Sequence, residues 1–223
     1  MTQLIIATAA FLITHYIAST PLRGALVNVL GQRGYLGLYS LLALASLSWM
    51  IWAHNRAPAA LLWELPELRY LPLLFMPFAL IFAAAGLITR NPTAVAMEGA
   101  LKDKEPARGI LRLTRHPLMW AIALWALVHL LAKGDASSLV FFGGFVVLAL
   151  SGTVLIDKRK RATQGEDWAR FAAVTSNVPF AAILGGRNQF RLAEIGWAKI
   201  GVGMALFVLF LLAHAYLFGV PAY

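Results

Sequence analysis

The sequence predicts an all-α membrane protein, a polytopic bundle of about six transmembrane helices. Three observations predict it: the composition, six long apolar stretches, and an uneven distribution of positive charge. Of the 223 residues, 60% are hydrophobic and only 13% are charged, and the mean hydropathy is +0.72. A soluble domain carries about 25% charged residues, so this chain has too few to cover a soluble surface. The composition therefore excludes an ordinary soluble domain and predicts that most apolar residues face lipid.

Six apolar stretches approach the length of a membrane-spanning helix, which needs roughly 20 mostly apolar residues to cross a bilayer core. The connectors between them carry Pro and Gly, which interrupt helices. We expect a single integral membrane domain over residues 1–223, with spans at Leu4–Ser19, Tyr35–Ala53, Tyr70–Ile88, Pro117–Ala132, Leu139–Ile156 and Gly196–Gly219.

Lysine and arginine residues concentrate in alternate connectors, which predicts the orientation because positive residues are retained on the cytoplasmic side. Three lie in the second and fourth connectors, namely Arg56, Arg69 and Lys133. Fifteen lie in the first, third and fifth connectors: Arg23, Arg33, Arg90, Lys102, Lys104, Arg108, Arg112, Arg115, Lys158, Arg159, Lys160, Arg161, Arg170, Arg187 and Arg191. We expect both termini outside the cytoplasm. The start Met1-Thr2-Gln3 lacks the basic region of a cleaved signal peptide, so the first span is expected to be retained.

The formal charge of +9 does not indicate nucleic-acid binding, because the positive residues lie beside the spans. The run Lys158-Arg159-Lys160-Arg161 directly follows the fifth span, where a basic cluster normally contacts anionic lipid headgroups. Further on, the stretch Asp167–Ala173 places Trp168, Phe171 and Ala172 on one helical face. We expect a short interfacial helix that covers the cytoplasmic face.

The residue inventory restricts the chemistry. The chain has no cysteine, so metal or redox chemistry must use its five histidines. Apart from Lys199, no Asp, Glu, Lys or Arg falls within the predicted spans, which argues against an ion-coupled transporter.

Three histidines fall within the spans, where a polar side chain is costly and often marks a site. They are His15, His129 and His214. Two imidazoles from separate helices can hold a heme in a membrane through neutral ring nitrogens. The alternative is that each imidazole only donates a hydrogen bond to a neighbouring helix or a headgroup. His214 has Phe210 and Phe218 one turn away on either side, as in a packed aromatic stripe, and is a minor candidate.

Depth in the membrane leaves the pairing open. At ~1.5 Å per residue, His15 lies about 17–20 Å from the outer face and His129 only about 5 Å from it. By depth alone, His116 is the better match to His15, and His129 lies nearer His54 and His214. His116 belongs to the segment Thr114-Arg115-His116-Pro117, where Pro117 suits the first helical turn and Arg115 suits an interfacial anchor.

Segments spread over nearly the whole chain resemble the NnrU family, bacterial membrane proteins whose relatives include the 15-cis-zeta-carotene isomerases of plants and cyanobacteria. The first part of the likeness covers His15, Ala18–Arg23, Gly31–Leu38 and Asn91-Pro92. The second part covers Gly109–Trp120, Ala126–His129, Asp157-Lys158-Arg159, Thr175-Ser176 and Val178–Ile183. As a set these motifs are specific, although each alone would be weak.

The resemblance implies a multi-span helical protein and, as in the isomerase relatives, a b-type heme bound by two histidines. Carried over by motif, the iron ligands fall on His15 and His129. The isomerase relatives have a cysteine three residues before the second histidine, and here that position is Ala126. Bacterial members are associated with denitrification. We therefore expect heme b as cofactor, an inner-membrane location, and a redox-linked role with a hydrophobic substrate or an electron-transfer partner.

Two other functions are kept open. An Arg-His-Pro sequence followed by a Gly-Glu and aromatic segment is similar to isoprenylcysteine-type membrane methyltransferases. That resemblance implies a cofactor site at the cytoplasmic ends of the last helices, which here would involve His116, Glu166 and Trp168. Over the whole chain, the expected cofactor-binding residues are His15, His129, Arg115 and His116. The third reading is a non-catalytic accessory protein of a respiratory complex, whose histidines only pack or form hydrogen bonds.

Overall fold

The computed structural model describes residues 1–222, and these residues form helices and connecting turns without any strand. The six predicted spans correspond to the six long apolar helices α1 (Thr2–Ile17), α2 (Leu22–His54), α3 (Leu71–Ile88), α4 (Pro117–Lys133), α5 (Ala136–Val174) and α8 (Trp197–Phe218). The four candidates long and apolar enough to cross a membrane are α2, α3 with the turn before it, α5 and α8, whereas α1 and α4 are shorter apolar helices. Short helical turns connect them: η1 (Pro66–Tyr70), η2 (Glu98–Lys102), η3 (Gly109–Arg112), α6 (Ala181–Leu184) and α7 (Leu192–Ile195). The prediction of a polytopic helical membrane protein is confirmed.

Apolar side chains remain exposed along these helices, as expected where lipid covers them. On α8, Leu212 is 79% exposed and Tyr216 is 92% exposed. A soluble protein rarely exposes apolar surface continuously along a helix.

Two helices are longer than the hydropathy pattern predicts. Helix α2 begins at Leu22 instead of Tyr35 and is kinked at Gly31, whose φ of 70° is a conformation that glycine adopts readily. Helix α5 continues past Ile156 to Val174 and is broken at Gly165, with φ 50°. The reason for the extension is that Lys and Arg are good helix formers. The basic run after Ile156 therefore continues the helix beyond the apolar stretch.

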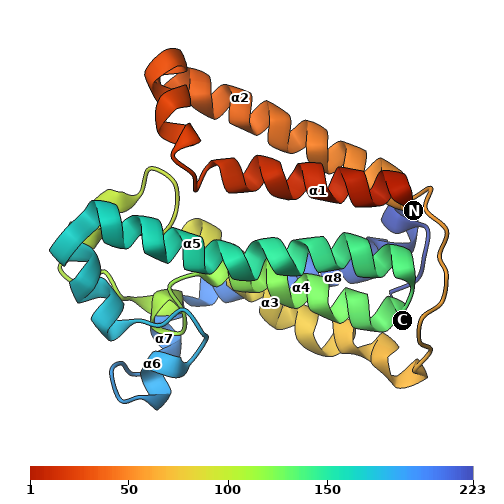
Figure 1. Ribbon diagram of the computed structural model, residues 1–223. Helices are drawn as coiled ribbons and strands as arrows, with labels where there is room; N and C mark the ends of the chain where they lie inside the picture. Colours follow the sequence, from red (N-terminus) through yellow and green to blue (C-terminus); the bar gives the residue numbers. More distant parts are fainter. Residues whose placement is uncertain (223) are drawn as a thin grey trace. The chain divides into compact units, whose positions relative to one another are not determined.

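The chain forms two compact units. Unit 1 comprises Met1–Arg69 and Ala126–Leu148, and in it α1 and α2 lie antiparallel and side by side (Figure 1). The first part of α5 approaches α1 closely at Gly144, where an added Cβ would lie 2.7 Å from Thr8 Cγ2. Small residues allow such contact between membrane helices.

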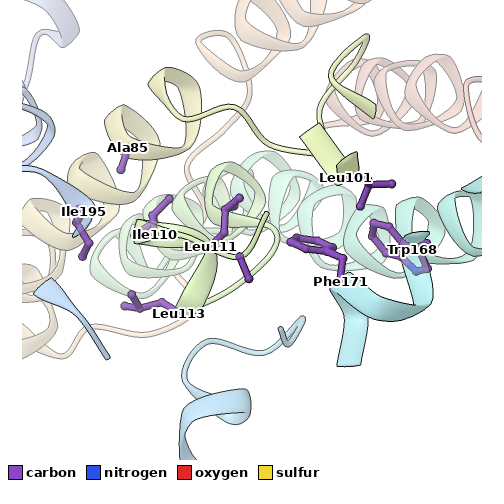
Figure 2. Close-up of a cluster of buried hydrophobic side chains, with 9 residues drawn as sticks. Ala85, Leu101, Ile110, Leu111, Leu113, Trp168, Phe171 and Ile195 are labelled. Carbon is purple, nitrogen blue, oxygen red and sulfur yellow. The ribbon is translucent and has the colours of Figure 1, made fainter. Parts of the chain in front are cut away.

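Unit 2 comprises Tyr70–Trp125 and the chain from Ala149 onward. Helices α3 and α8 pack along each other, and at their closest point an added Cβ on Gly203 would lie 2.6 Å from Ile81 Cα. Figure 2 shows the apolar core of this unit, where η3, the end of α5 and α7 supply side chains. The core residues are Ala85, Leu101, Ala107, Ile110, Leu111, Leu113, Trp168, Phe171 and Ile195.

The apolar face predicted for Asp167–Ala173 is confirmed. Trp168 and Phe171 are 1% and 0% exposed and belong to the core of unit 2, and Ala172 packs against it. Asp167 and Arg170 form an ion pair on the outer side. The position of this segment relative to a membrane surface stays a prediction.

Candidate functional site

Unit 1 contains pairs of aromatic side chains spaced four residues apart, which places both members on one side of their helix. The pairs lie on three helices: Phe11 and His15 on α1, with ring centroids 4.3 Å apart, Tyr35 and Tyr39 on α2, 6.0 Å apart, and Phe141 and Phe145 on α5, 5.3 Å apart. Contacts between helices join these pairs. Phe11 lies 5.1 Å from Phe145, and His15 lies 6.1 Å from Tyr39.

Phe142 extends this set of rings toward two further histidines. Its ring centroid lies 5.1 Å from Phe141, 5.4 Å from His129 and 6.2 Å from His54. His54 also stacks on Phe141 at 4.4 Å. We call the whole set the aromatic ladder: Tyr35, Tyr39, His15, Phe11, Phe145, Phe141, Phe142, His54 and His129. The aromatic ladder places His129 and His54 against the same ring, that of Phe142. This agrees with the estimate of depth in the membrane, which put His129 near His54.

The chemistry of His15 suits a metal ligand. Its Nδ1 lies 2.7 Å from the carbonyl oxygen of Phe11, one turn earlier on α1. A carbonyl oxygen only accepts hydrogen bonds, so Nδ1 carries the proton and Nε2 keeps its lone pair. Metal-bound histidines are usually oriented by such a second hydrogen bond.

Four phenylalanine rings lie along the chain of contacts from His15 to His129. His15 lies against Phe11, Phe11 against Phe145, and Phe145 against Phe141. Phe141 lies against Phe142, which in turn lies against His129. The use of His15 and His129 as two ligands of one iron stays a prediction.

No alternative cluster for a bare metal ion is found among the described residues, since none of their His, Asp and Glu side chains gather in groups of three or more.

Unit 2 holds the other two predicted site residues, Arg115 and His116, which bind a third residue, Asp157. Arg115 Nε lies 3.0 Å from both carboxylate oxygens of Asp157, and Arg115 Nη2 lies 2.6 Å from Oδ2. His116 Nε2 lies 2.6 Å from Oδ1. The side chains of His116, Arg115 and Asp157 are 0%, 11% and 13% exposed. We call these three residues the Arg-His-Asp cluster.

Burial favours the neutral form of the His116 imidazole. Burial lowers the pKa of His116 below its usual value, although the neighbouring Asp157 opposes this effect. A carboxylate only accepts hydrogen bonds, so Nε2 donates to Asp157 and Nδ1 is left with a lone pair. This Nδ1 is buried and has no hydrogen-bond partner.

The loop before α4 is fixed by polar contacts around the cluster. The side chains of Asn91 and Thr93 donate to the carbonyl oxygen of Arg115. Thr114 donates to the carbonyl oxygen of Asn177 at 2.5 Å. From the end of α5, Trp168 lies over the Arg115 guanidinium, with 5.9 Å from Cζ to the ring centroid. The cluster therefore sits in a preorganised environment.

A second ion pair in unit 2 ties η3 to α7. Arg112 Nε lies 2.7 Å from Glu194 Oε2, and Nη2 lies 3.1 Å from Oε1. Hydrogen bonds from Arg112, and from the backbone of Gly109, lower the pKa of Glu194 to about 2. The pair is structural, because it joins two short elements around the core.

The remaining predicted residues lie apart from these sites. Glu166 is exposed, just past the break at Gly165, whereas His116 and Trp168 are buried. His214 is held by the backbone, with Nδ1 2.8 Å from the carbonyl oxygen of Val220. The pairing of His116 with His15 stays a prediction, because the two residues belong to different units.

Sequence reasoning missed Asp157 and the phenylalanines of the ladder as site residues. Asp157 directly follows the apolar stretch of the fifth span, but its spacing along the chain does not link it to Arg115 and His116. The four-residue spacing of Phe11 with His15 and of Phe141 with Phe145 was the available signal for the ladder.

Comparison with known proteins identifies the family. The family model described as NnrU protein matches residues 3–222. The chain belongs to the NnrU family. It is 28% identical over 212 residues to a chloroplast protein of Zea mays named 15-cis-zeta-carotene isomerase, covering 90% of this chain and 58% of the maize protein. It is 38% identical over 80 residues to the Arabidopsis thaliana protein of the same name, covering 36% of this chain and 22% of that protein.

This NnrU protein thus spans less than two thirds of the length of the curated relatives that it matches. No solved structure matches it.

Proposed function

We propose that this NnrU protein binds heme b in unit 1 and has a redox-linked, isomerase-like role on a conjugated polyene. The observation that carries the proposal is the similarity over 90% of the chain to a protein named 15-cis-zeta-carotene isomerase. A carotene is a long, flat hydrocarbon, and a membrane protein with few buried charges suits such a substrate. A bound heme would supply a one-electron couple.

The residues of unit 1 support this proposal in separate ways. His15 has its Nδ1 bound to the Phe11 carbonyl oxygen and its Nε2 available as a ligand atom. The phenylalanines of the ladder surround its histidines with buried apolar rings, since Phe11 is 3% and Phe141 8% exposed. His129 is proposed as the second iron ligand from the family likeness.

Heme binding is tested by the reduced-minus-oxidised visible spectrum of the purified protein after expression with ample heme. We expect a low-spin b-type spectrum in the unsubstituted protein. We expect it to be lost in His15→Ala and in His129→Ala. The matched control is His214→Ala, which removes an apolar-helix histidine whose Nδ1 already contacts a carbonyl oxygen, and it should keep the full heme content.

Each outcome decides one part of the proposal. A colourless protein would remove heme b. Loss of heme in His15→Ala but not in His129→Ala would keep the heme and reject the histidine pair. Isomerase activity is tested separately, by incubating vesicles that contain the protein with 15-cis-zeta-carotene and separating the isomers by chromatography. An unchanged isomer ratio with heme-loaded protein would reject the polyene role.

Other functions expected from the sequence stay predictions. A link to nitrogen-oxide chemistry follows from the family likeness alone. A methyltransferase would bind S-adenosylmethionine in a way that depends on the exposed Glu166 and the buried His116. An accessory role would be indicated by a partner that co-purifies with colourless protein in mild detergent.

A further inference from the structure

The Arg-His-Asp cluster leaves one buried nitrogen unused. His116 donates from Nε2 to Asp157 Oδ1 at 2.6 Å, and its Nδ1 has no hydrogen-bond partner although it is shielded from solvent. Buried polar atoms in proteins nearly always have a partner. An unpaired lone pair in the interior therefore indicates that a water or a ligand donates a hydrogen bond to it.

A second buried polar atom without a partner belongs to the residue that covers this cluster. Trp168 is 1% exposed, and its Nε1 has no hydrogen-bond acceptor. Its ring lies 5.9 Å from Arg115 Cζ. Trp168 lies three residues after the break of α5 at Gly165. Two buried atoms without a partner thus belong to residues that contact the Arg115–Asp157 pair: the acceptor His116 Nδ1 and the donor Trp168 Nε1.

The chemistry of these two atoms excludes most ligands. A fully deprotonated anion such as sulfate has no proton to donate to His116 Nδ1, and Arg115 already uses its guanidinium on both oxygens of Asp157. A metal ion needs several ligands, and the part of the chain that the structure describes has no group of three His, Asp or Glu side chains. An ammonium group would lie beside the positive charge of Arg115. A neutral hydroxyl remains, because it both donates and accepts.

We propose that the Arg-His-Asp cluster binds a hydroxyl group of a neutral polyol, such as the glycerol headgroup of a lipid. The hydroxyl donates to His116 Nδ1, and its oxygen is available to the Trp168 indole N–H. Arg115 acts by holding Asp157, which in turn keeps the proton of His116 on Nε2. Arg115 and His116 end the third connector, directly before the fourth predicted span, and the positive-inside rule assigns this basic connector to the cytoplasmic side. The site shares no residue with the aromatic ladder and does not depend on heme.

The experiment follows the imidazole nitrogens of the full chain directly. The protein is labelled with ¹⁵N-histidine, and its five histidines are observed by solid-state NMR in lipid nanodiscs. Discs of phosphatidylglycerol supply a lipid glycerol, and discs of phosphatidylmethanol have the same charge without a hydroxyl. Glycerol added to the phosphatidylmethanol discs supplies the free polyol. His116→Gln assigns the signal, because glutamine keeps an N–H toward Asp157 and lacks the Nδ1 acceptor.

We expect the unprotonated Nδ1 signal of His116 to shift to lower frequency in phosphatidylglycerol relative to phosphatidylmethanol. A shift with the lipid alone identifies a headgroup, and a shift with glycerol as well identifies any accessible polyol. The proposal would be overturned if the His116 Nδ1 signal were identical in phosphatidylglycerol discs, in phosphatidylmethanol discs and in phosphatidylmethanol discs with glycerol. Such a result would mean that Nδ1 binds water or has no partner.

Trp168→Phe provides the matched variant for the donor, since it keeps an aromatic ring over Arg115 and removes the indole N–H. We expect the His116 signal to persist and the midpoint of the glycerol titration to move to several-fold higher concentration. An unchanged midpoint would overturn the role assigned to Trp168.

Discussion

At the scale of single residues, the Arg112–Glu194 pair gives unit 2 a defined pH dependence. The pKa of Glu194 is lowered from 4.5 to about 2 in the folded protein, and its side chain is 19% exposed. A group whose pKa is lowered on folding stabilises the folded state above its unfolded pKa. This contribution is therefore complete above about pH 4.5 and is lost as the pH falls toward 2.

We predict that Glu194→Gln lowers the free energy of unfolding by about 2 kcal/mol at pH 7, somewhat less than the full shift implies because the pair is partly solvated. The measurement is thermal unfolding in detergent from pH 7 to pH 2, and the two curves should converge at the acid end. Glu105→Gln is the matched control, because Glu105 lies 3.9 Å from Arg112 and is 64% exposed. Curves that stay parallel down to pH 2 would show that the Glu194 charge is not the source.

The residues of the sites were only partly predictable, for a physical reason. A histidine inside an apolar stretch is visible in the sequence because its cost in lipid does not depend on its neighbours. The partners of Arg115 and His116 depend on how α5 passes the start of α4, so Asp157 could not be assigned from spacing along the chain. The order of rings from His15 to His129 likewise depends on the packing of α1 against α5.

At the scale of helices, apolar length predicted where the six long helices lie, and small residues determine how closely they pack. Helix ends were less predictable. Hydropathy ends α5 at Ile156, but the charged residues that follow keep forming backbone hydrogen bonds until Gly165 breaks the helix. The pattern of Trp168 and Phe171 did predict a buried face, because helical periodicity persists where hydropathy falls.

Gly203 on α8 offers a test of this close packing. An added Cβ at this position would lie 2.6 Å from Ile81 Cα and 2.8 Å from Ile81 N, so the backbone of α3 would have to move. We predict that Gly203→Ala destabilises the protein by about 1–3 kcal/mol. Gly201→Ala is the control on the same helix, since nothing lies within 4 Å of an added Cβ there. It should be neutral or slightly stabilising, because Ala favours helix over Gly. Equal unfolding temperatures for the two variants would contradict close packing of α3 against α8.

At the scale of the whole molecule, the distribution of positive charge predicts the topology. The first, third and fifth connectors hold fifteen Lys and Arg residues against three in the second and fourth. Positively charged short loops are retained in the cytoplasm. With an even number of spans, both termini would then lie on the side opposite the cytoplasm. We propose that the membrane is the cytoplasmic membrane of a bacterium.

This topology can be tested by labelling single-cysteine variants, because the unsubstituted chain contains no cysteine. Ala59 lies in the second connector, Lys104 lies in the third, and both are exposed. In intact spheroplasts, a membrane-impermeant maleimide should label Ala59→Cys and spare Lys104→Cys, and both should react once the membrane is permeabilised. The reason is that moving Lys104 to the outer side would also carry the other positive residues of its connector across the bilayer. Labelling of Lys104→Cys with protection of Ala59→Cys would show the inverse orientation. In that case, the Arg-His-Asp cluster would face the opposite leaflet from the one assigned to it.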